Sequence, residues 1–78
     1  MIIRFNDDAG DSLIHALNAL AGWTISATYK SEGFPDTAAI VEAEDESLII
    51  CDVDDGGRPM TNSKYHVAYD EVRSITVL

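Results

Sequence analysis

The chain has 78 residues, of which 46% are hydrophobic, 14 are acidic and 5 are Lys or Arg. This length predicts a single domain over residues 1–78, since domains usually contain about 50 to 200 residues. The net charge of −9 opposes sequence-independent binding of nucleic acid, which depends on basic side chains that neutralise phosphates. We therefore expect a macromolecular partner to be a basic protein surface, with no direct contact to nucleic acid.

The cysteine content and the N-terminal sequence predict the compartment. Cys51 is the only cysteine, so no intramolecular disulfide can form. The first residues contain no apolar stretch of about 7 to 15 residues, which a signal peptide needs. No apolar run approaches the roughly 18 residues that cross a bilayer. The sequence thus predicts a cytoplasmic protein without a membrane segment.

A short strand and a helix are predicted in the first third of the chain. Residues 2–5 form an apolar run typical of an edge strand. Residues 11–21 have apolar side chains at helical spacing, namely Leu13, Ile14, Leu17, Leu20 and Ala21. Asp8 or Asp11 can accept the free backbone N–H groups at the start of this helix, and Gly22 suits a left-handed position just after its end.

The apolar period then changes from 3.6 to 2, which indicates strands. Trp23, Ile25, Ala27 and Tyr29 alternate with polar residues and predict a strand over residues 23–30 with these four side chains inward. Gly33 and Pro35 mark the following loop. The remaining predicted elements are strands at residues 37–43, 48–53, 64–69 and 73–78, a turn at 44–47, a loop at 54–63 and one helical turn at 70–72.

These elements predict an α+β fold in which the N-terminal helix packs on a five-stranded antiparallel meander. The side chains expected to meet between the helix and the sheet are Leu13, Leu17, Leu20, Ile25, Val41, Ile49 and Val67. The strand, turn and strand over residues 65–78 are similar to the end of small barrels of the Sm and SH3 type. This resemblance covers about residues 11–78 and implies that the sheet curls into a small barrel. An open sheet with the helix on one face is the alternative.

No catalytic residue is predicted. His15 and His66 are the only histidines, and no serine or cysteine occupies a recognisable nucleophile motif. Cys51 alternates with Ile49 and Val53, so we expect it to be a small buried hydrophobic residue. The Gly- and Asn-containing RNA-binding signatures of Sm proteins are absent, and their RNA function is not carried over. The sequence predicts neither an enzyme nor a cofactor.

A run of aspartates before Gly56 and Gly57 invites a calcium interpretation. Counted from Asp52, an EF-hand loop needs Asp or Asn at its fifth position and Glu at its twelfth. Those positions are Gly56 and Ser63. The spaced glycines and the lysine of a phosphate-binding loop are also missing around Arg58. We therefore predict no metal site.

Half of the acidic residues lie between positions 42 and 55, a stretch without Lys or Arg. They are Glu42, Glu44, Asp45, Glu46, Asp52, Asp54 and Asp55. The simplest interpretation is a solvated face that promotes solubility. The functional interpretation is a docking surface, because concentrated charge accelerates and orients encounters with an opposite patch. With the hairpin tip near Asp45, we expect Glu42 and Glu44 to lie close to the strand that carries Asp52.

Two functions follow as hypotheses. The first is a nonenzymatic binding protein whose acidic hairpin docks on a basic, nucleic-acid-binding site of another protein. In size and charge the chain resembles small phage-encoded inhibitors, anti-CRISPR proteins among them, that act as DNA mimics. The alternative is a structural or assembly subunit that oligomerises through a barrel edge, most simply as a dimer. The edge expected for this is the last strand, with Ile75, Thr76, Val77 and Leu78.

Overall fold

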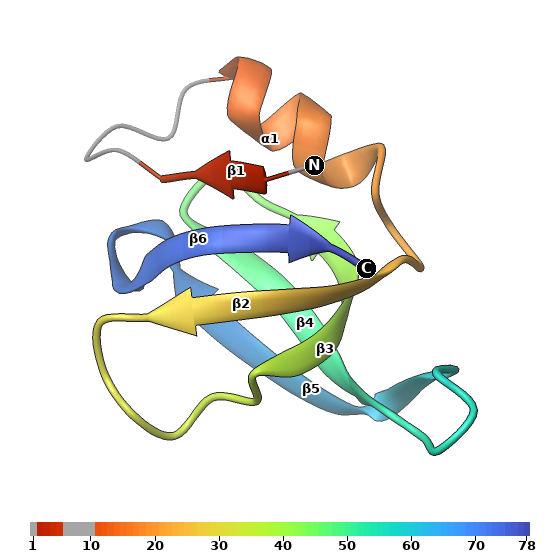
Figure 1. Cartoon of the computed structure of the whole chain (residues 1–78). Coiled ribbons are helices and arrows are strands. Elements are labelled where there is room, and N and C mark those ends of the chain that lie inside the picture. Colours follow the sequence, from red (N-terminus) through yellow and green to blue (C-terminus); the bar gives the residue numbers. More distant parts are fainter. Residues whose placement is uncertain (1, 6–10) are drawn as a thin grey trace.

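The computed structural model describes residues 2–5 and 11–78 (Figure 1). Its elements are β1 (Ile2–Arg4), α1 (Asp11–Asn18), β2 (Thr24–Tyr29), β3 (Thr37–Ala43), β4 (Ser47–Val53), β5 (Pro59–Ala68), the 3₁₀ turn η1 (Tyr69–Glu71) and β6 (Val72–Val77). The helix cap predicted at Asp8 or Asp11 depends on side chains that lie outside the described part of the chain.

Helix α1 ends at Asn18, three residues earlier than predicted. The backbone N–H of Ala19 still bonds four residues back, to the oxygen of His15 at 3.1 Å, whereas that of Leu20 bonds only three residues back, to Leu17 at 3.0 Å. The chain therefore tightens into 3₁₀-type turns before β2. Gly22 has φ +87°, which confirms the left-handed glycine predicted after the helix.

The six strands form one antiparallel sheet in the order β1-β6-β2-β3-β4-β5. The predicted meander holds from β2 to β5, but β6 returns and inserts between β1 and β2. Ile75, for example, lies opposite Ile3 on one side and Ala27 on the other. The edge predicted at residues 75–78 is therefore wrong, because β6 already has two neighbours. Its position results from η1, which turns the chain back toward β2.

Within the described residues, the sheet begins at β1 and ends at β5, and these two strands do not pair. The barrel is thus not closed, and the fold is an open antiparallel sheet with one short helix. In Figure 1, β6 and β2 run across the front while β3, β4 and β5 cross behind them at an angle. The apolar core lies where the two parts face each other.

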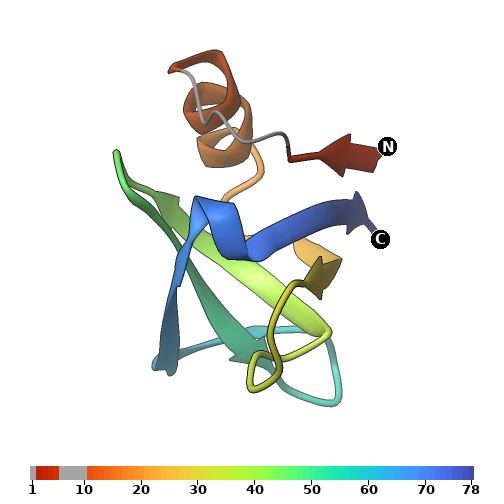
Figure 2. The same ribbon diagram turned by 90° about the vertical axis from the view of Figure 1, so that its left-hand side faces the viewer.

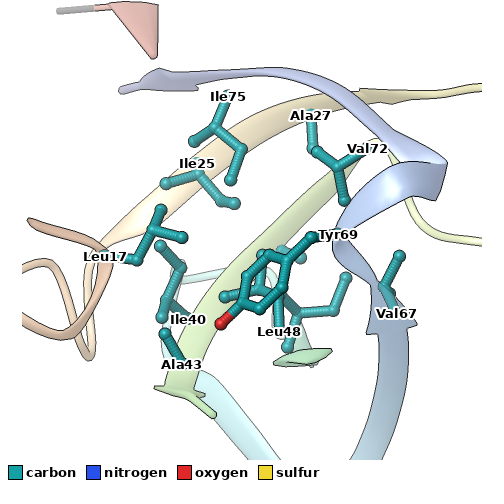
Figure 3. Close-up of a cluster of buried hydrophobic side chains, with 12 residues drawn as sticks. Leu17, Ile25, Ala27, Ile40, Ala43, Leu48, Val67, Tyr69, Val72 and Ile75 are labelled. Carbon is teal, nitrogen blue, oxygen red and sulfur yellow. The ribbon is translucent and has the colours of Figure 1, made fainter. Parts of the chain in front are cut away.

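The core is built from one side of this curved sheet and from the helix (Figure 3). Leu17 is fully buried, which confirms its predicted central position, and Leu13 and Leu20 are half-buried against it. The largest fully buried side chains are Leu17, Ile25, Ile40, Leu48, Ile50, Ile75, Val67, Val72 and Cys51. Burial of each large aliphatic side chain contributes roughly 1.5–3 kcal/mol.

Of the core positions predicted on β3 and β4, Val41 is wrong, and Ile49 is buried but does not face the helix cluster. Val41 is half-buried because the register shifts between Ile40 and Glu42, which leaves Ile40 in the core. An irregularity of this kind reverses which residues face inward. On β4 the side chains that join the cluster around Leu17 are Leu48 and Ile50, whereas Ile49 is buried outside that cluster.

Two further differences lie at strand starts. Trp23 is 55% exposed rather than inward, because it precedes β2 and its backbone N–H bonds the oxygen of Leu20 in the turn. Strand β5 begins at Pro59, so the loop predicted at 54–63 shrinks to residues 54–58. Three residues, 61–63, lie between the pairings of Asp52 with Met60 and of Cys51 with Lys64. Because of this irregularity, the first residues of β5 do not alternate strictly between apolar and polar, and the sequence pattern did not predict them as a strand.

Candidate functional site

The turn between β3 and β4 presents the carboxylates of Glu44, Asp45 and Glu46, which are all exposed. We call these three residues the acidic tip. The backbone N–H of Glu44 bonds the oxygen of Ser47 at 2.9 Å and closes the turn. Because this turn is tight, the three carboxylates point away from the sheet into solvent. The solvated face expected from the sequence is confirmed for these three side chains.

Tyr69 anchors the backbone of the acidic tip. Its hydroxyl donates a hydrogen bond to the backbone oxygen of Glu44, and its ring stacks on Phe5 with centroids 6.3 Å apart. Burial raises the pKa of Tyr69, and the charges of Asp45 and Glu44 raise it further. The hydroxyl therefore stays protonated as a donor over the physiological range, and the backbone of the tip has a fixed position.

A second anchor for the acidic tip comes from the helix. The side-chain amide of Asn18 donates to the backbone oxygen of Ala43 at 3.0 Å and accepts from the backbone N–H of Ala43 at 2.8 Å. This pair of bonds satisfies both backbone groups at the last residue of β3. The helix thereby holds the end of the strand from which the tip extends.

The turn between β4 and β5, residues 54–58, uses its first aspartate differently. One carboxylate oxygen of Asp54 accepts hydrogen bonds from the backbone N–H groups of Gly56 and Arg58, both at 2.9 Å. Gly57 has φ +78°, which glycine adopts without strain. Asp54 is thus a structural residue of the turn, even though it is exposed, whereas Asp55 is exposed without such a bond in the described structure.

Asp52 is half-buried and also has a partner within the protein. The hydroxyl of Tyr65 donates to its two carboxylate oxygens at 3.0 and 3.2 Å. This hydrogen bond is the main cause of the raised pKa of Tyr65, followed by desolvation and the charge of Asp52. The carboxylate of Asp52 is therefore less free than those of the acidic tip to contact another molecule.

The structure does not bring the seven predicted acidic residues together. Glu42 is exposed on β3 opposite Ile49, and Asp52 lies three residues farther along β4. The expectation that Glu42 lies beside the strand that carries Asp52 is therefore confirmed, but Asp52 itself lies apart from Glu42 along that strand. Figure 2 shows the β3–β4 turn at the upper left and the β4–β5 turn at the lower right. At about 3.3 Å per residue, the length of β4 separates the two turns by roughly 20 Å.

A pocket that the sequence did not reveal lies beside the loop between β2 and β3, the yellow loop at the lower left of Figure 1. Its volume is about 350 Å³, and Tyr29 and Phe34 line it with rings 5.1 Å apart. Gly33 and Pro35 predicted the loop. Tyr29 was predicted to face the core, so its position at the rim of a pocket was not expected. The sequence signal for this pocket was the pair Glu32 and Asp36 on either side of Phe34 in the loop.

The other residues considered for chemistry lie apart from these features. His15 and His66 are exposed, and Cys51 is fully buried, as predicted from its apolar neighbours. Burial raises the pKa of the Cys51 thiol, which keeps it protonated and unreactive at neutral pH. In the described part of the chain, no three His, Cys, Asp or Glu side chains gather as metal ligands would.

Comparison with protein-family models, with curated proteins and with solved structures gives no match for this chain. Within the described residues, the one helix is too short to cross a membrane.

Proposed function

We propose that this chain is a nonenzymatic binding protein that docks through its acidic tip on a basic surface of a partner protein. The observation that carries the proposal is the arrangement of three adjacent exposed carboxylates on a turn anchored by Tyr69 and Asn18. Because the backbone of the turn is already fixed, docking loses little conformational entropy. Charges held in this way favour fast, oriented encounter with an opposite patch.

The seven acidic residues named from the sequence divide into a main and a secondary contact in this proposal. Glu42, Glu44, Asp45 and Glu46 form the main contact at one end of β4. Asp55, with Asp52 and Asp54 behind it, forms the secondary contact at the other end. A partner that touches both turns needs a basic surface roughly 20 Å long, the length of β4. A basic cleft that binds nucleic acid has such dimensions and charge.

The finer form of the proposal is an inhibitor of the DNA-mimic class, similar in action to anti-CRISPR proteins. The carboxylates then occupy positions in the partner where phosphates of a nucleic acid would bind. Support comes from the net charge of −9 and from the exposure of the acidic tip. Competition distinguishes this form from simple docking, because a mimic and a short DNA duplex exclude each other from the same site.

The test begins with a partner isolated from extract at low salt and released by raising salt. Its affinity for the wild-type chain and for the variant E44Q/D45N/E46Q is then measured at several salt concentrations. A charge-matched control, E32Q/D36N/D70N, also removes three negative charges from exposed residues but none from either turn. We expect the tip variant to associate more slowly and with a flatter salt dependence. In the control, the association rate and its salt dependence should change much less. Equal effects of the two variants would contradict a role for the tip.

Assembly of several copies is the second candidate function, and one observation favours it. Strand β5 ends the sheet, and residues 56–69 contain no acidic residue although the chain as a whole carries 14. Lys64 and His66 lie on this edge and are exposed. A second copy can add its own β5 here with less repulsion than elsewhere. Sedimentation at high micromolar concentration tests this, since K64E/H66E should dissociate such a dimer and a strictly monomeric wild type excludes it.

A further inference from the structure

The pocket at the β2–β3 loop combines rings and carboxylates. Tyr29 and Phe34 are both half-buried, and their rings are tilted by 41° to each other, so the faces of the rings are not covered by a parallel stack. Glu32 and Asp36 complete the rim, and both are exposed. Among the described residues that line the pocket, none is basic. The lining thus offers aromatic faces and negative charge at one place.

The loop that forms the pocket is held at both ends. The hydroxyl of Tyr29 donates to the backbone oxygen of Pro35 at 2.8 Å, and the backbone N–H of Ala27 bonds the oxygen of Asp36 at 2.8 Å. On the other side, the hydroxyl of Ser31 donates to a carboxylate oxygen of Glu71 at 2.6 Å. Gly33, with φ +108°, permits the reversal of the chain between these anchors. The pocket is therefore formed before a ligand arrives.

Charge inside the pocket opposes anions. Burial raises the pKa of Tyr29 to about 12, and the negative charge of Asp36 contributes to this shift. Tyr29 thus stays neutral and presents an uncharged ring, while the carboxylates of Glu32 and Asp36 remain available for a positive group. A cation over an aromatic ring is attracted by the negative face of the ring, and more strongly as the cation is desolvated. The combination selects a cation with an apolar stem.

We propose that this pocket binds a guanidinium or alkylammonium group, carried by an arginine or lysine side chain or by a small free cation. The volume of about 350 Å³ lies at the lower end of ligand pockets, which suits one side chain rather than a nucleotide. The stem of the cation packs on Tyr29 and Phe34, and its charged end faces Glu32 and Asp36. This inference goes beyond the proposed function and uses none of the residues of the two acidic turns.

The test is a titration of the isotope-labelled chain with ethylguanidinium, in which NMR chemical shifts of the backbone amides report binding. Saturating shifts confined to residues 28–36 are expected, with a dissociation constant on the order of millimolar for so small a ligand. The same titration with a short neutral peptide that contains one arginine, and with its citrulline counterpart, isolates the positive charge. The citrulline peptide should bind at least several-fold more weakly.

Variants identify the groups that carry the binding. E32Q and D36N should each weaken the guanidinium several-fold, and F34L should do so by removing a ring while keeping apolar volume. D70N removes one charge outside the pocket and serves as the control, with binding close to wild type. Tighter binding of the arginine peptide than of ethylguanidinium assigns the site to a protein side chain, and equal binding shows that a free cation suffices. Shifts that do not saturate, or that spread over all acidic residues, would overturn the proposal.

A failure here is distinguishable from a failure of the proposed function. Loss of the guanidinium site leaves the salt-dependent docking of the acidic tip intact, because the pocket variants E32Q, D36N and F34L alter no residue of the tip. Conversely, a tip without a partner leaves the pocket titration unchanged. The two measurements therefore test two separate surfaces of the same molecule.

Discussion

At one end of β4 the carboxylates of Glu44, Asp45 and Glu46 extend into solvent, whereas at the other end those of Asp52 and Asp54 accept hydrogen bonds from the protein itself. In the sequence these residues form one acidic stretch with no visible division. The structure shows that some carboxylates of such a stretch bond to the protein's own turn or neighbouring strand, while others remain free to interact. Charge density in a sequence therefore does not identify an interface until hydrogen bonds have been assigned.

The largest expected effect concerns the helix that holds the end of β3 near the acidic tip. Leu17 is fully buried beside Ile40 and Ala43 (Figure 3). Leu17→Ala should lower the free energy of unfolding by about 2–5 kcal/mol, through lost burial and the cavity left behind. Chemical denaturation measures this loss. A midpoint equal to wild type would show that the helix does not cover this end of the sheet.

A direct comparison of two aspartates comes next. Asp54→Ala removes the acceptor for the N–H groups of Gly56 and Arg58, and should cost about 1–2 kcal/mol of stability. Asp45→Ala, at the acidic tip, should stay within about 0.5 kcal/mol of wild type. Both variants lose one negative charge, so their difference in denaturation reports the hydrogen bonds. Equal stabilities would remove the distinction drawn between the two turns.

Two tyrosine hydroxyls allow the same comparison at the anchors. Tyr69→Phe loses the bond to the backbone oxygen of Glu44 and should cost about 1 kcal/mol, because Tyr69 is buried. Tyr65→Phe loses the bond to Asp52, which is only half-buried, and should cost less. Thermal unfolding of both variants at neutral pH decides the order. A larger loss for Tyr65→Phe would reverse the assignment of the stronger anchor.

High pH should loosen the same anchor at the tip. The pKa of Tyr69 in the folded chain is raised above its ordinary value of 10.0. A raised pKa means that the folded state favours the protonated hydroxyl, so its contribution to stability is complete below pH 10 and is lost as the pH rises beyond it. Denaturation across this range should show a steeper loss for wild type than for Tyr69→Phe. Parallel curves would contradict the shift.

The smallest effect on stability is expected for E44Q/D45N/E46Q. Removing three neighbouring negative charges relieves repulsion and should raise the free energy of unfolding by a few tenths of a kcal/mol. Denaturation at low and high salt measures the gain, which should shrink as salt screens the charges. A clear loss of stability would show that the acidic tip, like the β4–β5 turn, is structural.

The sequence predicted what depends on neighbouring residues. The helical face around Leu17, the left-handed Gly22 and the bounds of β3 all follow from local periodicity and turn chemistry, and they are confirmed. The register irregularities that displace Val41 and hide the start of β5 could not be predicted. Each depends on which residues of a distant strand lie opposite, and alternation within one strand does not contain that information.

The candidate sites show the same limit. Exposure of the acidic tip followed from the cost of burying unpaired carboxylates, and it is confirmed. The separation of the tip from Asp52 was missed because it depends on the register between β3 and β4. The pocket was missed because it requires Tyr29, at the end of β2, to meet a loop whose shape is set by Glu71, 40 residues after its partner Ser31.

The placement of β6 between β1 and β2 has a consequence for how the chain folds. Ile3 pairs with Ile75, so contacts at the β1 edge of the sheet join residues from nearly opposite ends of the sequence. Folding rates fall as the mean sequence separation of contacts rises, because long loops must close before those contacts form. Strands β2 to β5 can pair from contacts between successive strands, while β1 can pair only after β6 arrives. We therefore expect a slow, highly cooperative folding reaction whose last step is the insertion of the final strand.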